Sequence, residues 1–128
     1  MLEKLQFYID GRWVDPVEPR TLDVVNPATE SVYGRISLGS SADVDKAVAA
    51  ANRAFESFSR TTREERTELL QAILAEFMKR HDDVAEAIMD EMGAPWALAK
   101  GAQALSGPQH IKAAIRALEH YAFEEHLG

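Results

Sequence analysis

The chain changes its pattern at Gly39-Ser40-Ser41, and this change limits the folds that it can form. Residues 1–38 hold short segments of aromatic and β-branched residues separated by turn residues, which is typical of strands and hairpins. Residues 39–128 place apolar residues at the spacing of amphipathic helices. We therefore predict a mainly α chain with short N-terminal β-hairpins, an α+β arrangement with a β-hairpin region over 1–38 and a helical region over 39–128.

Two pairs of strands are predicted in the first region. Asp10-Gly11 separates two segments rich in aromatic residues, and aspartate followed by glycine accepts the positive φ angles of a type I′ turn. Segments Leu22–Val25 and Val32–Ser37 flank a second group of turn residues, Asn26–Thr29. Both features favour local hairpins.

Helix starts in the second region are marked by capping residues. Ser40 precedes Asp43 by three positions, as in a capping box with Asp in place of Glu, and Ser41 is the alternative cap. Thr62 and Glu65 form a second box. Each box predicts the start of a helix.

Helix ends are marked by glycine, proline and polar residues. The polar run Arg80–Asp83 predicts a break in the long second helix, and Gly93 followed by Pro95 predicts its final end. Gly107-Pro108 is expected to end the next helix, which begins near Trp96, and to start the last one.

Composition excludes several classes of function. The chain has no cysteine, which removes disulfides, zinc–thiolate sites and any cysteine nucleophile. Its net charge of −7, from 14 basic and 21 acidic residues, disfavours nucleic acid and anionic membranes as partners. No segment reads as a signal peptide or a membrane span, so a cytoplasmic location is expected.

The residues themselves contain no complete active site. Neither a G-x-S-x-G turn nor a glycine-rich phosphate-binding motif occurs. The four histidines lack the three- or four-residue spacing of a ligand pair on one helix. No all-apolar run of the kind found in buried parallel strands is present either, so the helices must pack on one another or find their support beyond residue 128.

Five motifs, in order along the chain, resemble the N-terminal part of the NAD(P)-dependent aldehyde dehydrogenase superfamily. They are Phe7–Val14 (a "YI-G-W" hairpin), Val24–Thr29 ("V-NPATG", with Glu30 in place of the glycine), Asp43–Ala51 ("DVD-AV-AA"), Glu65–Leu70 ("ER--LL") and Glu91–Pro95 ("E-GKP", with Ala94 in place of lysine). This resemblance implies that the chain is the front segment of a Rossmann-like α/β cofactor domain. The central Rossmann strands and the catalytic domain of the family have no counterpart in residues 1–128.

The resemblance also implies the chemistry of a parent enzyme. Family members oxidise an aldehyde to a carboxylic acid with NAD or NADP, through a thiohemiacetal on a cysteine. Because this chain has no cysteine, we expect residues 1–128 alone to be inactive and to bind no cofactor. No catalytic or cofactor-binding residue is therefore assigned.

Two groups of residues match positions near the substrate entrance and near a cation site of the family. Gln109, Ala113 and Tyr121 match a helix that faces the substrate entrance, although plain helix packing explains these positions equally well. Val24, Val25 and Glu91 match the surroundings of a monovalent cation that some members bind.

Three hypotheses follow for the role of the chain. It is the N-terminal fragment of an aldehyde dehydrogenase, or a self-standing helical module that binds or supports another molecule, or an unrelated small helical domain. The ordered motifs favour the first. Under that hypothesis the partner is the remainder of the parent enzyme or another copy of this chain, and a homo-oligomer is expected.

Overall fold

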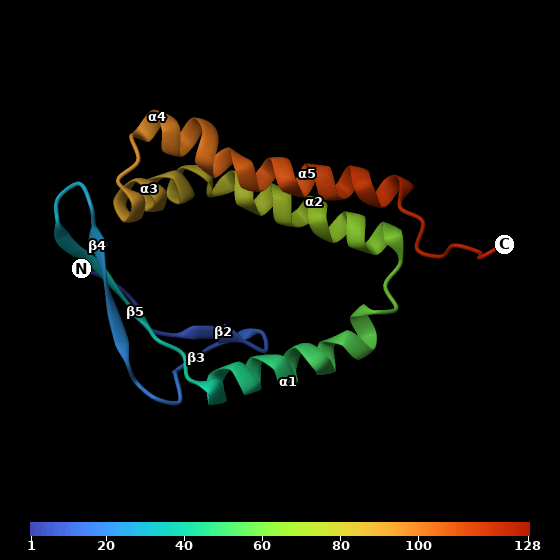
Figure 1. Cartoon of the computed structure of the whole chain (residues 1–128), viewed down its shortest axis with the longest axis horizontal. Coiled ribbons are helices and arrows are strands. Elements are labelled where there is room, and N and C mark those ends of the chain that lie inside the picture. The colour runs from blue at the N-terminus through green and yellow to red at the C-terminus, as the bar shows by residue number, and fades with distance from the viewer. The chain divides into compact units, whose positions relative to one another are not determined.

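A computed structural model describes residues 1–128, which divide into two compact units. Unit 1 consists of residues 1–60 and 90–93, and unit 2 of residues 61–89 and 94–128. All the strands belong to unit 1, whereas unit 2 is helical (Figure 1). The predicted mainly α chain with short N-terminal hairpins is thereby confirmed.

The larger sheet of unit 1 has three strands in the order β1-β5-β4. Strand β4 (Thr21–Asn26) pairs with β5 (Ser31–Ser37) in the antiparallel sense, as predicted, and β1 (Leu2–Lys4) adds to the other side of β5 in parallel. The strand β1 was not predicted from the sequence. Its approach depends on Gly34, because a Cβ at that position would lie 2.9 Å from the backbone oxygen of Leu2.

The second sheet of unit 1 is the predicted hairpin of β2 (Phe7–Ile9) and β3 (Arg12–Val14). Asp10 and Gly11 both have positive φ angles, 56° and 75°, as a type I′ turn requires. Tyr8 lies opposite Trp13, and their rings meet edge to face with centroids 5.3 Å apart. This aromatic pair stabilises a hairpin whose strands are only three residues long.

Helix α1 (Ser41–Phe58) begins at a buried carboxylate. Asp43 accepts hydrogen bonds from the Ser40 N–H at 2.9 Å, the Ser40 hydroxyl at 2.8 Å and the Val17 N–H at 2.9 Å. Ser40 is therefore the cap, and Ser41 is the first helical residue. The same carboxylate ties the loop after β3 to the start of α1.

These hydrogen bonds make the stability of unit 1 dependent on pH. The Ser40 and then the Val17 N–H groups hold the pKa of Asp43 below its ordinary value of 3.8. Because the pKa of Asp43 is lower in the folded state, the ionised carboxylate stabilises unit 1 at pH values above the unfolded-state pKa. This stabilisation is lost as the pH falls through the folded-state pKa.

We expect Asp43→Asn to lower the thermal midpoint at neutral pH, with the difference from wild type shrinking below about pH 4. The exposed Asp45→Asn is the control, and equal midpoints for the two variants would contradict the assignment.

Unit 2 is built on the pairing of α2 (Arg63–Lys79) with α5 (Ala104–His120), which Figure 1 shows side by side. The predicted capping box at the start of α2 is confirmed, since Thr62 N–H donates to Glu65 Oε2 at 2.7 Å and Glu65 N–H donates to Thr62 Oγ1 at 3.1 Å. Helix α3 (His81–Met92) follows α2 after a break at Arg80, and Gly93, at φ 67°, ends it as predicted.

The expected break at Gly107-Pro108 is wrong. The short helix α4 (Trp96–Leu98) leads through a π-helical turn, η1 (Ala99–Gln103), directly into α5, which continues through both residues. Gly107 serves close packing instead, because a Cβ there would lie 3.0 Å from the ring of Phe77 on α2. Pro108 is buried, and the wide π turn just before α5 lies where a helix adapts to a proline.

The fully buried apolar residues are few and small. Ala85, Ala94, Ala99 and Ala104 form the hydrophobic core cluster, against which Val84, Ile88 and Met89 pack. Many large apolar side chains are exposed, among them Tyr8, Trp13, Val44, Val48, Phe55, Phe58, Leu69, Ile73, Trp96 and Leu98. The apolar face of α1 is thus uncovered, whereas Ile111, Ile115 and Leu118 of α5 are half-buried. None of the helices has the length and hydropathy needed to cross a membrane.

Candidate functional site

The end of strand β4 meets the end of helix α3 within unit 1. Asn26 Nδ2 donates to Asp90 Oδ1 at 3.4 Å, while Asn26 Oδ1 accepts from the N–H groups of Ala28 and Thr29 at 2.9 and 3.3 Å. Gly93 lies against the same turn, since a Cβ on it would be 2.9 Å from Pro27 Cγ. Asn26 therefore orders its own turn and ties that turn to α3.

This junction includes the residues matched to a monovalent cation site. Val24 and Val25 lie on β4, where the pairing with β5 shifts register, and Glu91 lies on the last turn of α3. Glu91 is exposed, and the acidic side chain that reaches β4 is its neighbour Asp90. The structure thus brings the two segments together, but through Asp90 and Asn26. No group of three or more His, Cys, Asp or Glu side chains is placed to hold a metal ion.

Sequence reasoning missed Asp90 because adjacent residues on a helix point about 100° apart. Only one of Asp90 and Glu91 can face β4, and the motif alone does not say which one does. In the structure Asp90 is half-buried, whereas Glu91 and Met92 are exposed.

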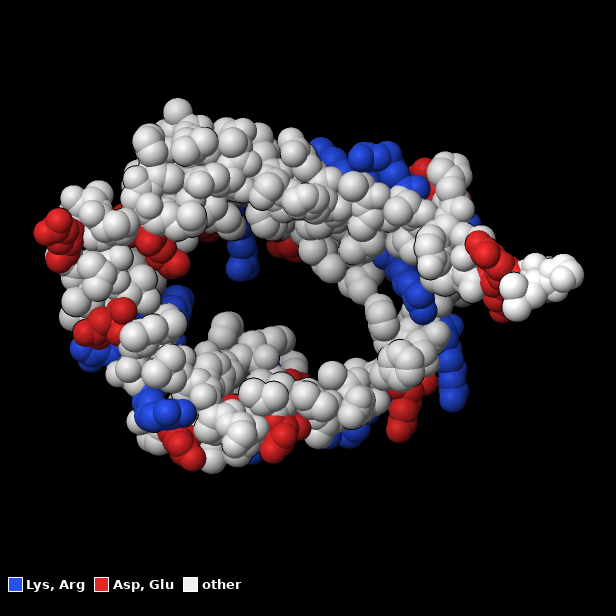
Figure 2. Space-filling view, viewed as in Figure 1, with Lys and Arg blue, Asp and Glu red and all other residues white.

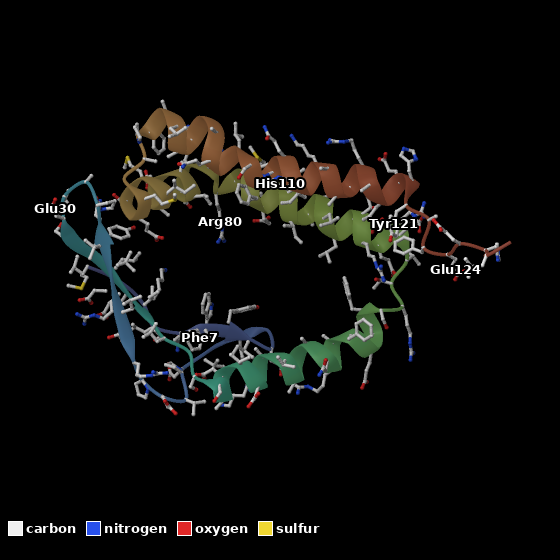
Figure 3. All side chains as sticks on the ribbon, viewed as in Figure 1. Phe7, Glu30, Arg80, His110, Tyr121 and Glu124 are labelled. Carbon is white, nitrogen blue, oxygen red and sulfur yellow. The ribbon has the colours of Figure 1, made fainter.

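The residues matched to a substrate entrance lie on and after α5 in unit 2. Gln109 and Ala113 are exposed and four residues apart, so they share one face of the helix. Tyr121 follows the last helical residue, and Figure 3 shows it at the C-terminal end of α5, beside the start of α2. Its ring packs edge to face on Phe123, with centroids 5.1 Å apart. Gln109 and Ala113 thus lie within α5, whereas Tyr121 lies just beyond its end.

Arg63 fixes the segment in which Tyr121 lies. Its two terminal nitrogens donate to the backbone oxygens of Glu119 at 3.1 Å and Tyr121 at 2.7 Å, and its guanidinium lies 5.6 Å from the centroid of Phe123. A cation at a helix C-terminus is favourable because the last carbonyls there carry partial negative charge. Sequence reasoning did not identify this contact, since Arg63 and Tyr121 are far apart in the chain.

A second charged cluster joins α3 to η1. Lys100 Nζ lies 2.8 and 3.0 Å from the two carboxylate oxygens of Asp82 and 5.3 Å from the centroid of the Trp96 ring. The hydrogen bond from Lys100 holds the pKa of Asp82 below its ordinary range. Each of these charges has a partner, so the cluster has the features of a structural tie.

The described residues do not fit a nicotinamide dinucleotide. Dinucleotide-binding folds place the pyrophosphate at a helix N-terminus that follows a strand and a glycine-rich turn. The turn from β5 into α1 holds one glycine, Gly39, and its Ser40 N–H donates to the carboxylate of Asp43, as does the Val17 N–H from the loop after β3. A phosphate there would meet this negative charge. Lys and Arg side chains are also scattered among Asp and Glu on the visible face (Figure 2).

Comparison with known proteins establishes the family. The sequence model of the aldehyde dehydrogenase family matches residues 13–127. The 3-succinoylsemialdehyde-pyridine dehydrogenase of a Pseudomonas species is 47% identical over 129 residues, which cover 100% of this chain and 27% of that protein. The chain therefore belongs to the aldehyde dehydrogenase family.

Solved structures agree with this assignment. The aldehyde dehydrogenase of Bartonella henselae has a TM-score of 0.96 and 43% identity, covering 99% of this chain and 27% of that one. Aldehyde dehydrogenase C of Pseudomonas syringae, solved with NAD+ and octanal, has a TM-score of 0.92 and 41% identity, covering 96% and 25%. The chain spans about a quarter of the length of the relatives it matches.

Proposed function

We propose that residues 1–128 supply a non-catalytic part of an NAD(P)-dependent aldehyde dehydrogenase, which oxidises an aldehyde to a carboxylic acid. The single observation that carries this proposal is the match of the family to residues 13–127 of a chain that has no cysteine. Since the proposed reaction needs a thiolate to attack the aldehyde, the nucleophile must come from another segment.

The exposed apolar faces support a role as part of a larger assembly. Val48 and Phe55 on α1 are 52% and 67% exposed, and Leu69 on α2 is 46% exposed. Large apolar side chains of this kind mark surfaces that bind other protein surfaces. We propose that the partner is the remainder of such an enzyme, or a further copy of the chain in a homo-oligomer.

The cofactor and the substrate are proposed only as classes. A relative in this family is solved with NAD+, which favours NAD or NADP as the hydride acceptor of the assembled enzyme. One relative is named for a pyridine semialdehyde and another is solved with octanal, and these two aldehydes are chemically different. We therefore propose aldehyde oxidation as the reaction and assign no single aldehyde.

In such an enzyme the contribution of α5 is to form one wall of the substrate entrance. Gln109 and Ala113 share an exposed helix face, and Arg63 fixes the backbone at Tyr121. We propose a second role for the β4–α3 junction near Val24, Val25 and Glu91, which is to hold a monovalent cation. Backbone carbonyls would have to supply most of the ligands, since Asp90 already bonds Asn26.

Activity measurements test the proposed function. Purified residues 1–128, supplied with an aldehyde and NAD+ or NADP+, should form no reduced cofactor, because no thiol is present. The chain is then co-expressed with the complementary remainder of the Bartonella henselae enzyme. Aldehyde-dependent reduction should appear, and it should disappear when the nucleophilic cysteine of that remainder is replaced by alanine.

Two outcomes would contradict the proposal. Turnover of aldehyde by residues 1–128 alone would show that the reaction does not need a cysteine. A chain that melts sharply as a monomer, binds no apolar dye and does not restore activity to the remainder would instead favour a self-standing module.

A further inference from the structure

The turn of the β2–β3 hairpin places an aspartate next to an unhindered backbone nitrogen. Asp10-Gly11 is the only Asp-Gly pair in the chain, and no Asn-Gly pair occurs. Both residues are exposed, and no atom beyond the two adjacent residues lies within 4 Å of the position that a Cβ of Gly11 would occupy. The Gly11 N–H lies outside the hairpin ladder, whose last pair is Ile9 with Arg12, and it makes no hydrogen bond.

This arrangement sets up an intramolecular reaction that needs only water. The Gly11 nitrogen attacks Cγ of the Asp10 side chain, an N–Cγ bond forms, and a carboxyl oxygen leaves as water with the amide proton. The resulting five-membered succinimide is then hydrolysed at the former main-chain carbonyl. One water is lost and one is gained, and the backbone now runs through the side-chain carbonyl as isoaspartate.

Arg53 holds the reacting carboxylate from the neighbouring helix. Its Nη2 donates to Asp10 Oδ2 at 2.9 Å, and the two residues lie 43 positions apart in the sequence. The contact occupies one carboxylate oxygen and ties the turn to α1, so the turn opens less readily into the geometry that ring closure requires.

We propose that Asp10-Gly11 is a site of spontaneous isoaspartate formation in this chain and that Arg53 is the residue that restrains it. The reaction is possible here because strands of three residues pair only marginally and open readily. It matters because isoaspartate adds a methylene to a two-residue turn. The pairing of Tyr8 with Trp13 depends on that turn and is lost when the turn lengthens.

The test compares two matched ion pairs in the full chain. Asp23 is bound by Arg35 at 2.9 Å, as Asp10 is bound by Arg53, but Val24 follows it. The branched side chain of Val24 hinders attack, and its backbone lies in the β4–β5 ladder. Wild type, Arg53→Ala and Arg35→Ala are incubated at neutral pH. Their tryptic peptides are then separated by chromatography, and isoaspartate is identified by unchanged mass, altered retention and resistance to an aspartate-specific peptidase.

We expect isoaspartate to accumulate at residue 10 and not at residue 23. Loss of a surface ion pair of ordinary strength should raise the rate at residue 10 roughly two- to fivefold in Arg53→Ala. Arg35→Ala should leave that rate unchanged, and Asp10→Glu should show no product because its ring would have six members. Equal rates in Arg53→Ala and wild type, or no more product at residue 10 than at residue 23, would overturn the proposal.

Discussion

Replacing Gly93 by alanine should lower the free energy of unfolding by about 2–4 kcal/mol, as measured by chemical denaturation. Two independent costs add at this position. The backbone has φ 67°, a conformation that disfavours any residue with a Cβ, and the new Cβ would lie 2.9 Å from Pro27 Cγ. Because this contact joins α3 to the Asn26 turn, the variant should also loosen the junction matched to a cation site.

Gly101→Ala is the matched control for this prediction. Gly101 also lies in the C-terminal half of the chain, but it is helical and no atom lies within 4 Å of its Cβ position. Alanine there should be neutral or stabilise by up to about 1 kcal/mol, since it forms helices better than glycine. Similar losses in the two variants would show that neither the φ angle nor the Pro27 contact restricts Gly93.

The parts of the fold that follow from the sequence depend on neighbouring residues. The Asp10-Gly11 turn, the Ser40 cap and the Thr62–Glu65 box each satisfy backbone groups within four positions. Such contacts depend on nearby residues and not on distant parts of the chain. For this reason the hairpins and the starts of α1 and α2 were correctly predicted.

The parts that could not be predicted depend on distant residues. Strand β1 exists because Gly34 lets a separate segment approach β5, and its three exposed residues carry no strand pattern of their own. Gly107-Pro108 was interpreted as a break because its meaning was taken from the local sequence. The ring of Phe77, thirty residues earlier, explains the glycine as a packing position.

The candidate site divides in the same way. The family resemblance directed attention to α5 and to the β4–α3 junction, and the family model matches residues 13–127, which include both. The motifs did not identify Asp90 or Arg63, whose roles depend on which way each side chain points from its helix. An entrance position is in addition defined by the surface opposite it, which helical periodicity does not specify.

The apolar face of α1 should make the isolated chain bind an apolar dye and self-associate. Val44, Val48 and Phe55 recur at helical spacing and are 59%, 52% and 67% exposed. Burying a side chain of this kind is worth about 1.5–3 kcal/mol, so an uncovered row of them favours contact with any apolar partner. In a Val48→Ser, Phe55→Ser double variant, dye fluorescence should fall several-fold and sedimentation should shift toward the monomer.

The control is the double variant Asp45→Ser, Glu56→Ser on the polar side of the same helix. It changes two exposed charged positions and leaves the apolar row intact. Circular dichroism should show similar helix content in both double variants, so that lost binding reports the surface and not unfolding. If the chain bound no dye and sedimented as a monomer, the exposed row would not act as an interface. The proposal that a larger enzyme covers α1 would then lose its main physical support.

The opposite outcome would support the proposal. If only the Val48→Ser, Phe55→Ser variant loses dye binding, and it also fails to restore activity to the complementary remainder, the same face carries both self-association and assembly.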